Sequence, residues 1–111
     1  REARRGLWRA DRHVAPAELT RSGFALVRGR IERVERNRGG EWLELEGDLA
    51  LRIAPQHRQA FAALQIQRLV GRTVEARGWV VERRQRAQGQ ARWLLAIEHP
   101  ALLEVHPGAG M

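Results

Sequence analysis

The sequence holds few side chains that could perform covalent chemistry. Its hydroxyl groups are limited to Thr20, Ser22 and Thr73, and it contains no tyrosine and no cysteine. A hydrolase needs an activated nucleophile beside a base, or a metal ion with its ligands. The four histidines are not spaced as metal ligands usually are. We therefore expect no catalytic residues, no metal site and no cofactor in this chain.

A run of carboxylates between positions 41 and 48 has two interpretations. Carboxylate oxygens bind hard cations, so the run could hold one. However, Glu44 and Glu46 alternate with Leu43 and Leu45, which is the pattern of a strand with one face toward the core and the other toward water. The sequence favours this second interpretation.

Arginine dominates the charge of the chain. All 20 basic residues are arginine, and the net charge is +7. A GC-rich genome favours arginine over lysine, but the guanidinium group also makes the bidentate contacts that suit phosphate. A surplus of this size favours a polyanionic partner, with nucleic acid ahead of an anionic membrane. No stretch approaches the roughly 20 apolar residues that cross a bilayer, and the lack of cysteine leaves the cellular compartment undecided.

A candidate nucleic-acid site combines arginines of two predicted loops with two tryptophans. Each arginine could contact a phosphate, and each tryptophan lies in the non-core phase of its strand, where a stacked base contributes about 1–3 kcal/mol. Solvated loops, and tryptophans packed under a helix or a neighbouring domain, are the alternative interpretation. The acidic run would repel phosphate if it shared a face with these loops. The candidate residues are Arg36, Arg38, Trp42, Trp79, Arg83, Arg84 and Arg86.

Alternating apolar and polar residues predict the sheet that must position this site. The first strand begins at Gly23 and is long and bent, because Gly29 lies in its middle and Val34 falls out of phase, as at a β-bulge near Glu32 and Arg33. Residues 41–47 and 49–53 alternate as the two strands of a hairpin. Residues 72–84 and 91–100 have the pattern of two further strands.

One helix is expected between the third and fourth strands. Pro55 can occupy its first turn, Gly71 lies beyond its end, and Phe61, Leu64 and Leu69 have helical spacing. The resulting order is that of the OB-fold, a five-stranded Greek-key barrel. An SH3-like barrel is the nearest alternative, but it would not need a helix of this length after strand three. We predict an all-β OB-fold with one helix between strands 3 and 4.

Two segments resemble a known family. EARRGLW, at positions 2–8, resembles the end of the last helix in staphylococcal-nuclease-like (thermonuclease) domains. The region 23–105, with GFALVRGRIERVERNRGGEWLELEG and VEARGWVVERR, is similar to the extra OB domain that follows the nuclease domain in some bacterial members. The family cleaves phosphodiester bonds with Ca²⁺ and acidic and arginine motifs that belong further upstream. None of those motifs can be placed on this chain.

The resemblance implies a division of the chain and a function. Residues 1–22 would be the end of an upstream nuclease-like domain with a linker, residues 23–106 the OB domain, and residues 107–111 a disordered tail. We predict a non-catalytic accessory domain that holds single-stranded nucleic acid for the nuclease domain of the same chain. The alternative is a structural module that packs on the nuclease domain or on another protein without binding nucleic acid.

Overall fold

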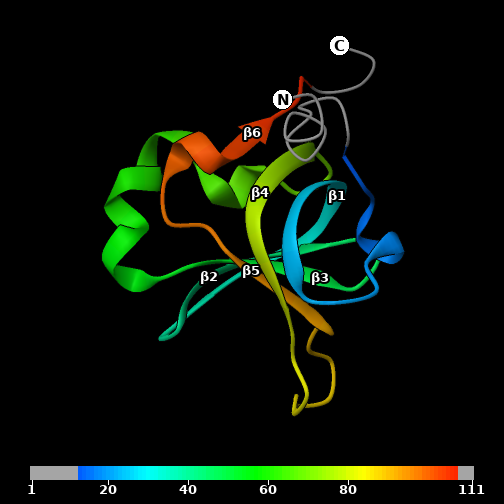
Figure 1. The fold of residues 1–111 in the computed structure, drawn as a ribbon. Coiled ribbons are helices and arrows are strands. Elements are labelled where there is room, and N and C mark those ends of the chain that lie inside the picture. Colours follow the sequence, from blue (N-terminus) through cyan, green and yellow to red (C-terminus); the bar gives the residue numbers. More distant parts are fainter. Residues whose placement is uncertain (1–12, 108–111) are drawn as a thin grey trace.

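Most of the regular structure is β-strand in the part of the chain that the structure describes, which is residues 13–107 of a computed structural model (Figure 1). Short 3₁₀ helices, rather than long α-helices, lie between the strands. In chain order the elements are η1 (Pro16–Glu18), β1 (Gly23–Asn37), β2 (Gly40–Leu45), β3 (Leu49–Ile53), η2 (Pro55–Leu64), η3 (Ile66–Arg68), β4 (Thr73–Glu82), β5 (Trp93–Ala96), η4 (Pro100–Leu102) and β6 (Leu103–Val105).

Five of the strands close into a ring. β1 pairs with β2, β2 with β3, and β4 with both β5 and β1, all antiparallel, while β3 and β5 run parallel. The hydrogen-bonded order is β1-β2-β3-β5-β4, and β4 returns to β1. The fold is therefore mostly β, with its main helical segment between β3 and β4, and at this level the prediction from the sequence is confirmed.

β1 takes part in two of the strand pairings that close the ring. Its first half, from Gly23 to Arg30, pairs with β4, and its second half, from Ile31 onward, pairs with β2. The register with β2 shifts between Ile31 and Arg33, which confirms the predicted bulge. A bulge bends a strand and increases its twist, so a single long strand can reach both neighbours.

The core fills the inside of the ring. In β1 to β4 the apolar side chains predicted to face inward are almost completely buried, and most of the residues between them are more exposed. In β4 the inward phase includes Gly78, where a Cβ would stand 2.8 Å from Leu95 Cδ1. Glycine therefore lets β4 pass close to β5. The buried strand residues include Val27, Ile31, Leu43, Leu45, Leu49, Leu51, Ile53, Val74, Ala76, Val80 and Leu95.

The segment between β3 and β4 differs from the single helix that we predict. η2 ends at Leu64, Gln65 adopts a left-handed conformation (φ 50°, ψ 62°), and η3 begins at Ile66. Phe61, Ile66 and Leu69 are all buried, whereas Leu64, which we expected on the apolar face of the helix, is only partly buried. The break at Gln65 turns all three toward the core, and the requirement for burial outweighs the helical pattern.

Segments before and after the ring also pack on it. Val14 forms a parallel bridge with Val27, and Pro16 is buried. β6, a short strand after the ring, pairs with the start of β4. Predictions for residues 1–12 and 108–111, including the segment EARRGLW, lie outside the described residues. Between residues 13 and 107 no helix is long and apolar enough to cross a membrane.

Candidate functional site

Trp42 lies on the outer face of β2, where the β1–β2 turn holds its indole ring. The Nε1–H of Trp42 donates to Asn37 Oδ1 at 2.9 Å, and the same oxygen accepts the N–H of Gly39 at 2.8 Å. A Cβ at Gly39 would stand 3.1 Å from the indole, so glycine at this turn leaves room for the ring. The turn therefore fixes the orientation of Trp42.

Two guanidinium groups lie over the Trp42 ring. The Cζ atoms of Arg52 and Arg83 are 5.4 Å and 6.0 Å from the ring centroid, distances at which a cation is attracted to the face of an aromatic ring. Arg52 is the cross-strand neighbour of Trp42, and its Nε donates to the Gly39 carbonyl at 2.8 Å. The tryptophan and the two arginines form one cluster, which we call the Trp42 cluster.

Arg83 is the partly buried cation of this cluster. Its Nε is buried and has no hydrogen-bond partner among residues 13–107. Burial lowers the pKa of Arg83, and the neighbouring charge of Arg86 lowers this pKa further. An arginine remains protonated near neutral pH even so. A guanidinium group that has lost part of its hydration interacts more strongly with a polar ligand than one surrounded by water, so Arg83 is well placed to contact a ligand.

A cavity of about 390 Å³ opens beside the Trp42 cluster, between the outer face of β2 and β3 and the loop that joins β4 to β5. Trp42, Arg83 and Ala50 line it, and residues 87–90 of the loop form another wall. Ala50 belongs to the outward phase of β3, yet it is only 1% exposed. The volume lies within the range of pockets that hold small organic groups.

The charges inside this cavity are balanced. Arg33 and Arg83 line it together with Glu35 and Glu44. Arg33 donates to Glu44 at 2.8 Å, and this hydrogen bond, with the charge of the same carboxylate, raises the pKa of Arg33. The acidic run thus contributes to this face of the sheet. The cavity suits an uncharged, hydrogen-bonding ring better than it suits a phosphate group.

The structure separates the other predicted arginines. Arg36 lies in β1 rather than in a loop, and its Nε donates to Glu41 at 2.8 Å beside a second cavity. Arg86 forms an ion pair with Asp48 at 3.4 Å. Arg38, in the β1–β2 turn, and Arg84, in the β4–β5 loop, are exposed. Only Trp42 and Arg83 of the predicted residues line the cavity beside the Trp42 cluster.

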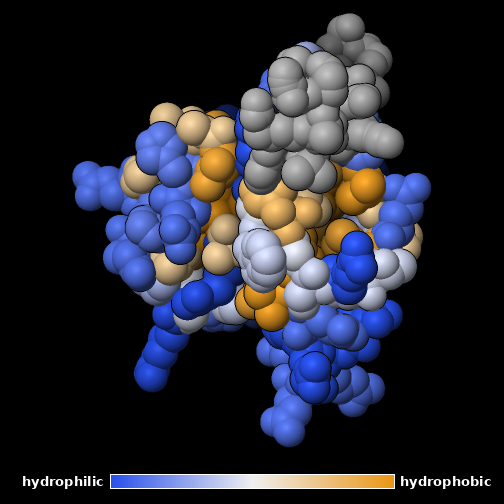
Figure 2. All heavy atoms as spheres, in the orientation of Figure 1, coloured by the Kyte–Doolittle hydropathy of each residue, from blue (hydrophilic) through white to orange (hydrophobic). Residues whose placement is uncertain are grey.

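The two arginine-bearing loops project from the ring toward the lower edge of the view in Figure 1, the β1–β2 turn at the left and the β4–β5 loop at the bottom. Figure 2 shows hydrophilic surface over both projections. Arg38, Arg84 and Arg86 therefore occupy a polar rim, and the cavity lies between the loops that form this rim.

Trp79 lies on a different face. It stands on the outer side of β4 opposite Phe24 of β1, it is 63% exposed, and it does not line the cavity beside Trp42. Phe24 and Val81 are also exposed large apolar residues of the β1–β4 face. We call Phe24, Trp79 and Val81 the apolar patch. The two predicted tryptophans thus belong to two distinct surfaces.

Two residues that contact Trp42 were missed from the sequence. Arg52 shows only as the polar residue between Leu51 and Ile53, and its proximity to Trp42 depends on the register of the β2–β3 hairpin. Asn37 is evident as a turn residue, but its hydrogen bond to the indole is not. The hairpin pattern could have identified Arg52 once the register was fixed.

Comparison of the sequence with protein-family models and with curated proteins found no match. The resemblance to staphylococcal-nuclease-like proteins therefore stays a prediction. Within residues 13–107 there is no group of three or more histidine, aspartate or glutamate side chains placed to hold a metal ion.

Proposed function

We propose that the five-stranded ring is an OB-fold and that it binds single-stranded nucleic acid on the outer face of β2 and β3. In OB-folds this face, with the loops after strands one and four, binds oligonucleotides. The proposed role is non-catalytic: the domain holds a strand for a nuclease-like domain of the same protein.

The strand order supports the fold assignment. Three features agree with a five-stranded Greek-key barrel. The long first strand pairs with both β2 and β4, β3 and β5 run parallel, and a helical segment lies between β3 and β4. The bulge in β1 and the close approach at Gly78 supply the curvature that such a small closed sheet needs.

The observation that carries the proposed function is the Trp42 cluster. A base can stack on an aromatic ring or on a guanidinium plane, and Trp42 and Arg83 offer both at the wall of one cavity. Because Asn37 already holds the indole, the ring does not have to be ordered on binding. Less conformational entropy is then lost when a base stacks.

The charge distribution supports a particular path for the strand. The cavity has balanced charges, so a base would enter it, while the phosphates would follow the rim. Arg38 and Arg84 are exposed there with no ion pair among the described residues, and Arg86 could exchange Asp48 for a phosphate. This arrangement places bases toward the sheet and the backbone toward water.

The test is a titration of the 111-residue chain with fluorescently labelled oligothymidylate of about ten nucleotides, a length within the site size of one OB-fold. We expect saturable binding at low salt that weakens as salt is added. Absence of binding at low salt would overturn the proposal.

A structural module is the second candidate function, and the apolar patch is the observation that favours it. Adjoining exposed apolar side chains on one face are typical of a protein contact surface. In this hypothesis β1 and β4 pack on the upstream nuclease-like domain that the family resemblance implies. The test is hydrogen exchange in the longer protein against the 111-residue chain. Slower exchange at the β1–β4 face of the longer protein supports the module, and equal exchange argues against it.

A further inference from the structure

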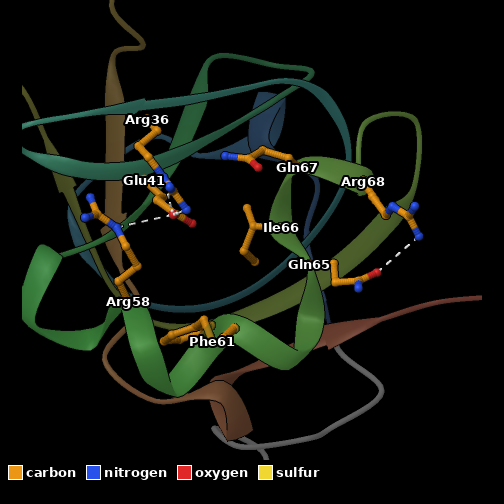
Figure 3. Close-up of a pocket in the computed structure, with 9 residues that line it drawn as sticks. Arg36, Glu41, Arg58, Phe61, Gln65, Ile66, Gln67 and Arg68 are labelled. Atoms are coloured by element: carbon orange, nitrogen blue, oxygen red, sulfur yellow. Dashed lines mark hydrogen bonds and ion pairs between the residues drawn. The ribbon is translucent and has the colours of Figure 1, made fainter.

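A second cavity, of about 380 Å³, lies beside the buried carboxylate of Glu41 (Figure 3). It is formed by the paired ends of β1 and β2 together with η2 and η3. Neither Trp42 nor Arg83 lines it. It is therefore separate from the cavity of the Trp42 cluster, and nothing proposed above uses it.

Glu41 holds two arginines at the wall of this second cavity. The carboxylate is 3% exposed, and its Oε2 accepts the Nε–H of Arg36 at 2.8 Å and lies 3.3 Å from the Nε of Arg58. Figure 3 shows the three side chains converging on one side of the cavity. A buried carboxylate is stable only when it is well paired, and the pairing also fixes the positions of two guanidinium groups.

The guanidinium groups still have donors to offer. The Nε of Arg58 is buried against Glu41 without a hydrogen bond of good geometry among residues 13–107. The Arg58 side chain is 37% exposed, so its terminal nitrogens are the donors that a ligand can reach. Arg68 also belongs to the lining, but in Figure 3 its side chain points away from Arg58, and its Nη1 donates to Gln65 Oε1 at 3.3 Å. Three arginines and one carboxylate line the cavity, so its lining carries a net charge of +2.

The cavity also has an apolar side. Phe61 and Ile66 line it, and in Figure 3 Ile66 lies between the Glu41 side and the Arg68 side, with Phe61 beneath. A free phosphate ion would occupy only a small part of the volume. A ligand that fits both features has a dianionic group for the arginines and an organic body for Phe61 and Ile66.

We propose that this cavity binds the phosphate monoester group of a small organic ligand, of which a nucleoside monophosphate is the probe. Arginine recognises phosphate through paired N–H donors, which Arg58 supplies at the cavity wall, and the positive charge of Arg68 adds to the attraction of an anion. Glu41 keeps Arg36 and Arg58 in place when no ligand is bound. The proposal does not depend on the binding of single-stranded nucleic acid at the Trp42 cluster.

The first experiment compares three probes by ¹H–¹⁵N NMR of the 111-residue chain. AMP and inorganic phosphate should shift the NMR signals of the Arg58 Nε–H and of the side-chain amides of Gln65 and Gln67. AMP should do so at a lower concentration than phosphate. Adenosine, which lacks the phosphate, should shift none of them. Equal shifts with adenosine, or no shifts with AMP, would overturn the proposal.

The second experiment uses variants with a matched control. Arg58→Gln should weaken AMP binding about tenfold, because a charge-assisted hydrogen bond is lost, and Arg68→Gln should weaken it about threefold. Arg77→Gln removes the same charge from the exposed outer face of β4, outside the cavity, and should change AMP binding less than twofold. Equal losses in all three variants would show only non-specific attraction and overturn the site. Arg68 is exposed, so the Arg68→Gln variant should fold. If Arg58→Gln does not fold, the loss of AMP affinity in Arg68→Gln tests the site.

A third variant tests the part assigned to Glu41. Glu41→Gln keeps the shape of the side chain but removes the negative charge that competes with phosphate for the arginines. We expect AMP to bind several-fold tighter in this variant, and weaker binding would contradict the assignment. The ¹H–¹⁵N signal of the Trp42 indole Nε1–H, recorded on the same samples, reports the other cavity, so the two proposals can fail separately.

Discussion

Trp42 and Trp79 have the same chemistry and the same place in the strand pattern, but their surroundings differ. Each lies on the outward phase of its strand, Trp42 in β2 and Trp79 in β4. Asn37, Arg52 and Arg83 contact the Trp42 ring, which lies at the wall of a cavity. Trp79 is 63% exposed opposite Phe24. A tryptophan on the outward face of a strand can therefore be held in place by the loops around it, as Trp42 is, or belong to an exposed apolar patch, as Trp79 does.

The loops explain this difference. The β1–β2 turn supplies Asn37 and Gly39 to Trp42, and the β4–β5 loop brings Arg83 over the same ring. Trp79 lies opposite Phe24 across the β1–β4 pair and does not line the cavity between these two loops. The comparison predicts that single-stranded nucleic acid binds at Trp42 and that a protein partner binds at Trp79.

The largest expected effect is the loss of the stacking platform. Trp42→Ala removes one base stack, worth about 1–3 kcal/mol, and should weaken oligothymidylate binding about 5- to 150-fold. Trp42→Phe keeps an aromatic face and should retain most of the affinity. Trp79→Ala should change the affinity less than twofold. Fluorescence anisotropy with a labelled oligonucleotide measures all three, and equal losses for both alanine variants would remove the distinction between the tryptophans.

The next largest effect concerns the arginine beside each tryptophan. Arg83→Lys keeps the charge but removes the planar guanidinium group over the Trp42 ring, so we expect binding to weaken about three- to tenfold. Arg77, which shares the outward phase of β4 with Trp79, is the matched control, and Arg77→Lys should have no effect. If both lysine variants bind as the parent chain does, Arg83 acts through charge alone.

The strands of both regions could be predicted from the sequence, because alternation reports directly which side chains face the core. The phases around Leu43 and Val80, and the bulge after Ile31, follow from the spacing of apolar residues. The helix between β3 and β4 was predicted less well. The spacing of apolar residues does not reveal that Gln65 adopts a left-handed conformation. This conformation interrupts the helical segment just before the buried residues Ile66 and Leu69.

The candidate site was predictable only in part. Sequence position places arginines in loops, but it does not tell which carboxylate each one meets. Arg36 is bound to Glu41, and Arg86 to Asp48, whereas Arg83 lies over Trp42. These pairings depend on cross-strand register and on the path of the β4–β5 loop, which residue types do not determine.

A smaller effect is expected from the residue that holds the Trp42 ring. Asn37→Ala removes the acceptor of two hydrogen bonds, and at this exposed site we expect the free energy of unfolding to fall by about 1 kcal/mol. Ser22→Ala is the control, since Ser22 Oγ accepts only the Glu82 N–H at 2.9 Å among the described residues, and it should cost about half as much. Urea unfolding measures both. A cost at Asn37 no greater than that at Ser22 would mean that the turn does not hold the indole.

The smallest change per residue is expected at the rim, and the salt dependence of binding reveals it. Each arginine that neutralises a phosphate of a single strand adds about 0.7 to the slope of log affinity against log salt. Arg84→Ala and Arg38→Ala should therefore each reduce that slope by about 0.7, because both side chains are exposed and free to follow the backbone. Trp42→Ala should weaken binding without changing the slope, since stacking releases no counterions. Arg77→Ala should leave both quantities unchanged. A reduced slope in the Arg77 variant would show that the overall charge of the chain attracts the nucleic acid. The faces that carry Trp42 and Trp79 would then not differ in their electrostatic contribution to binding.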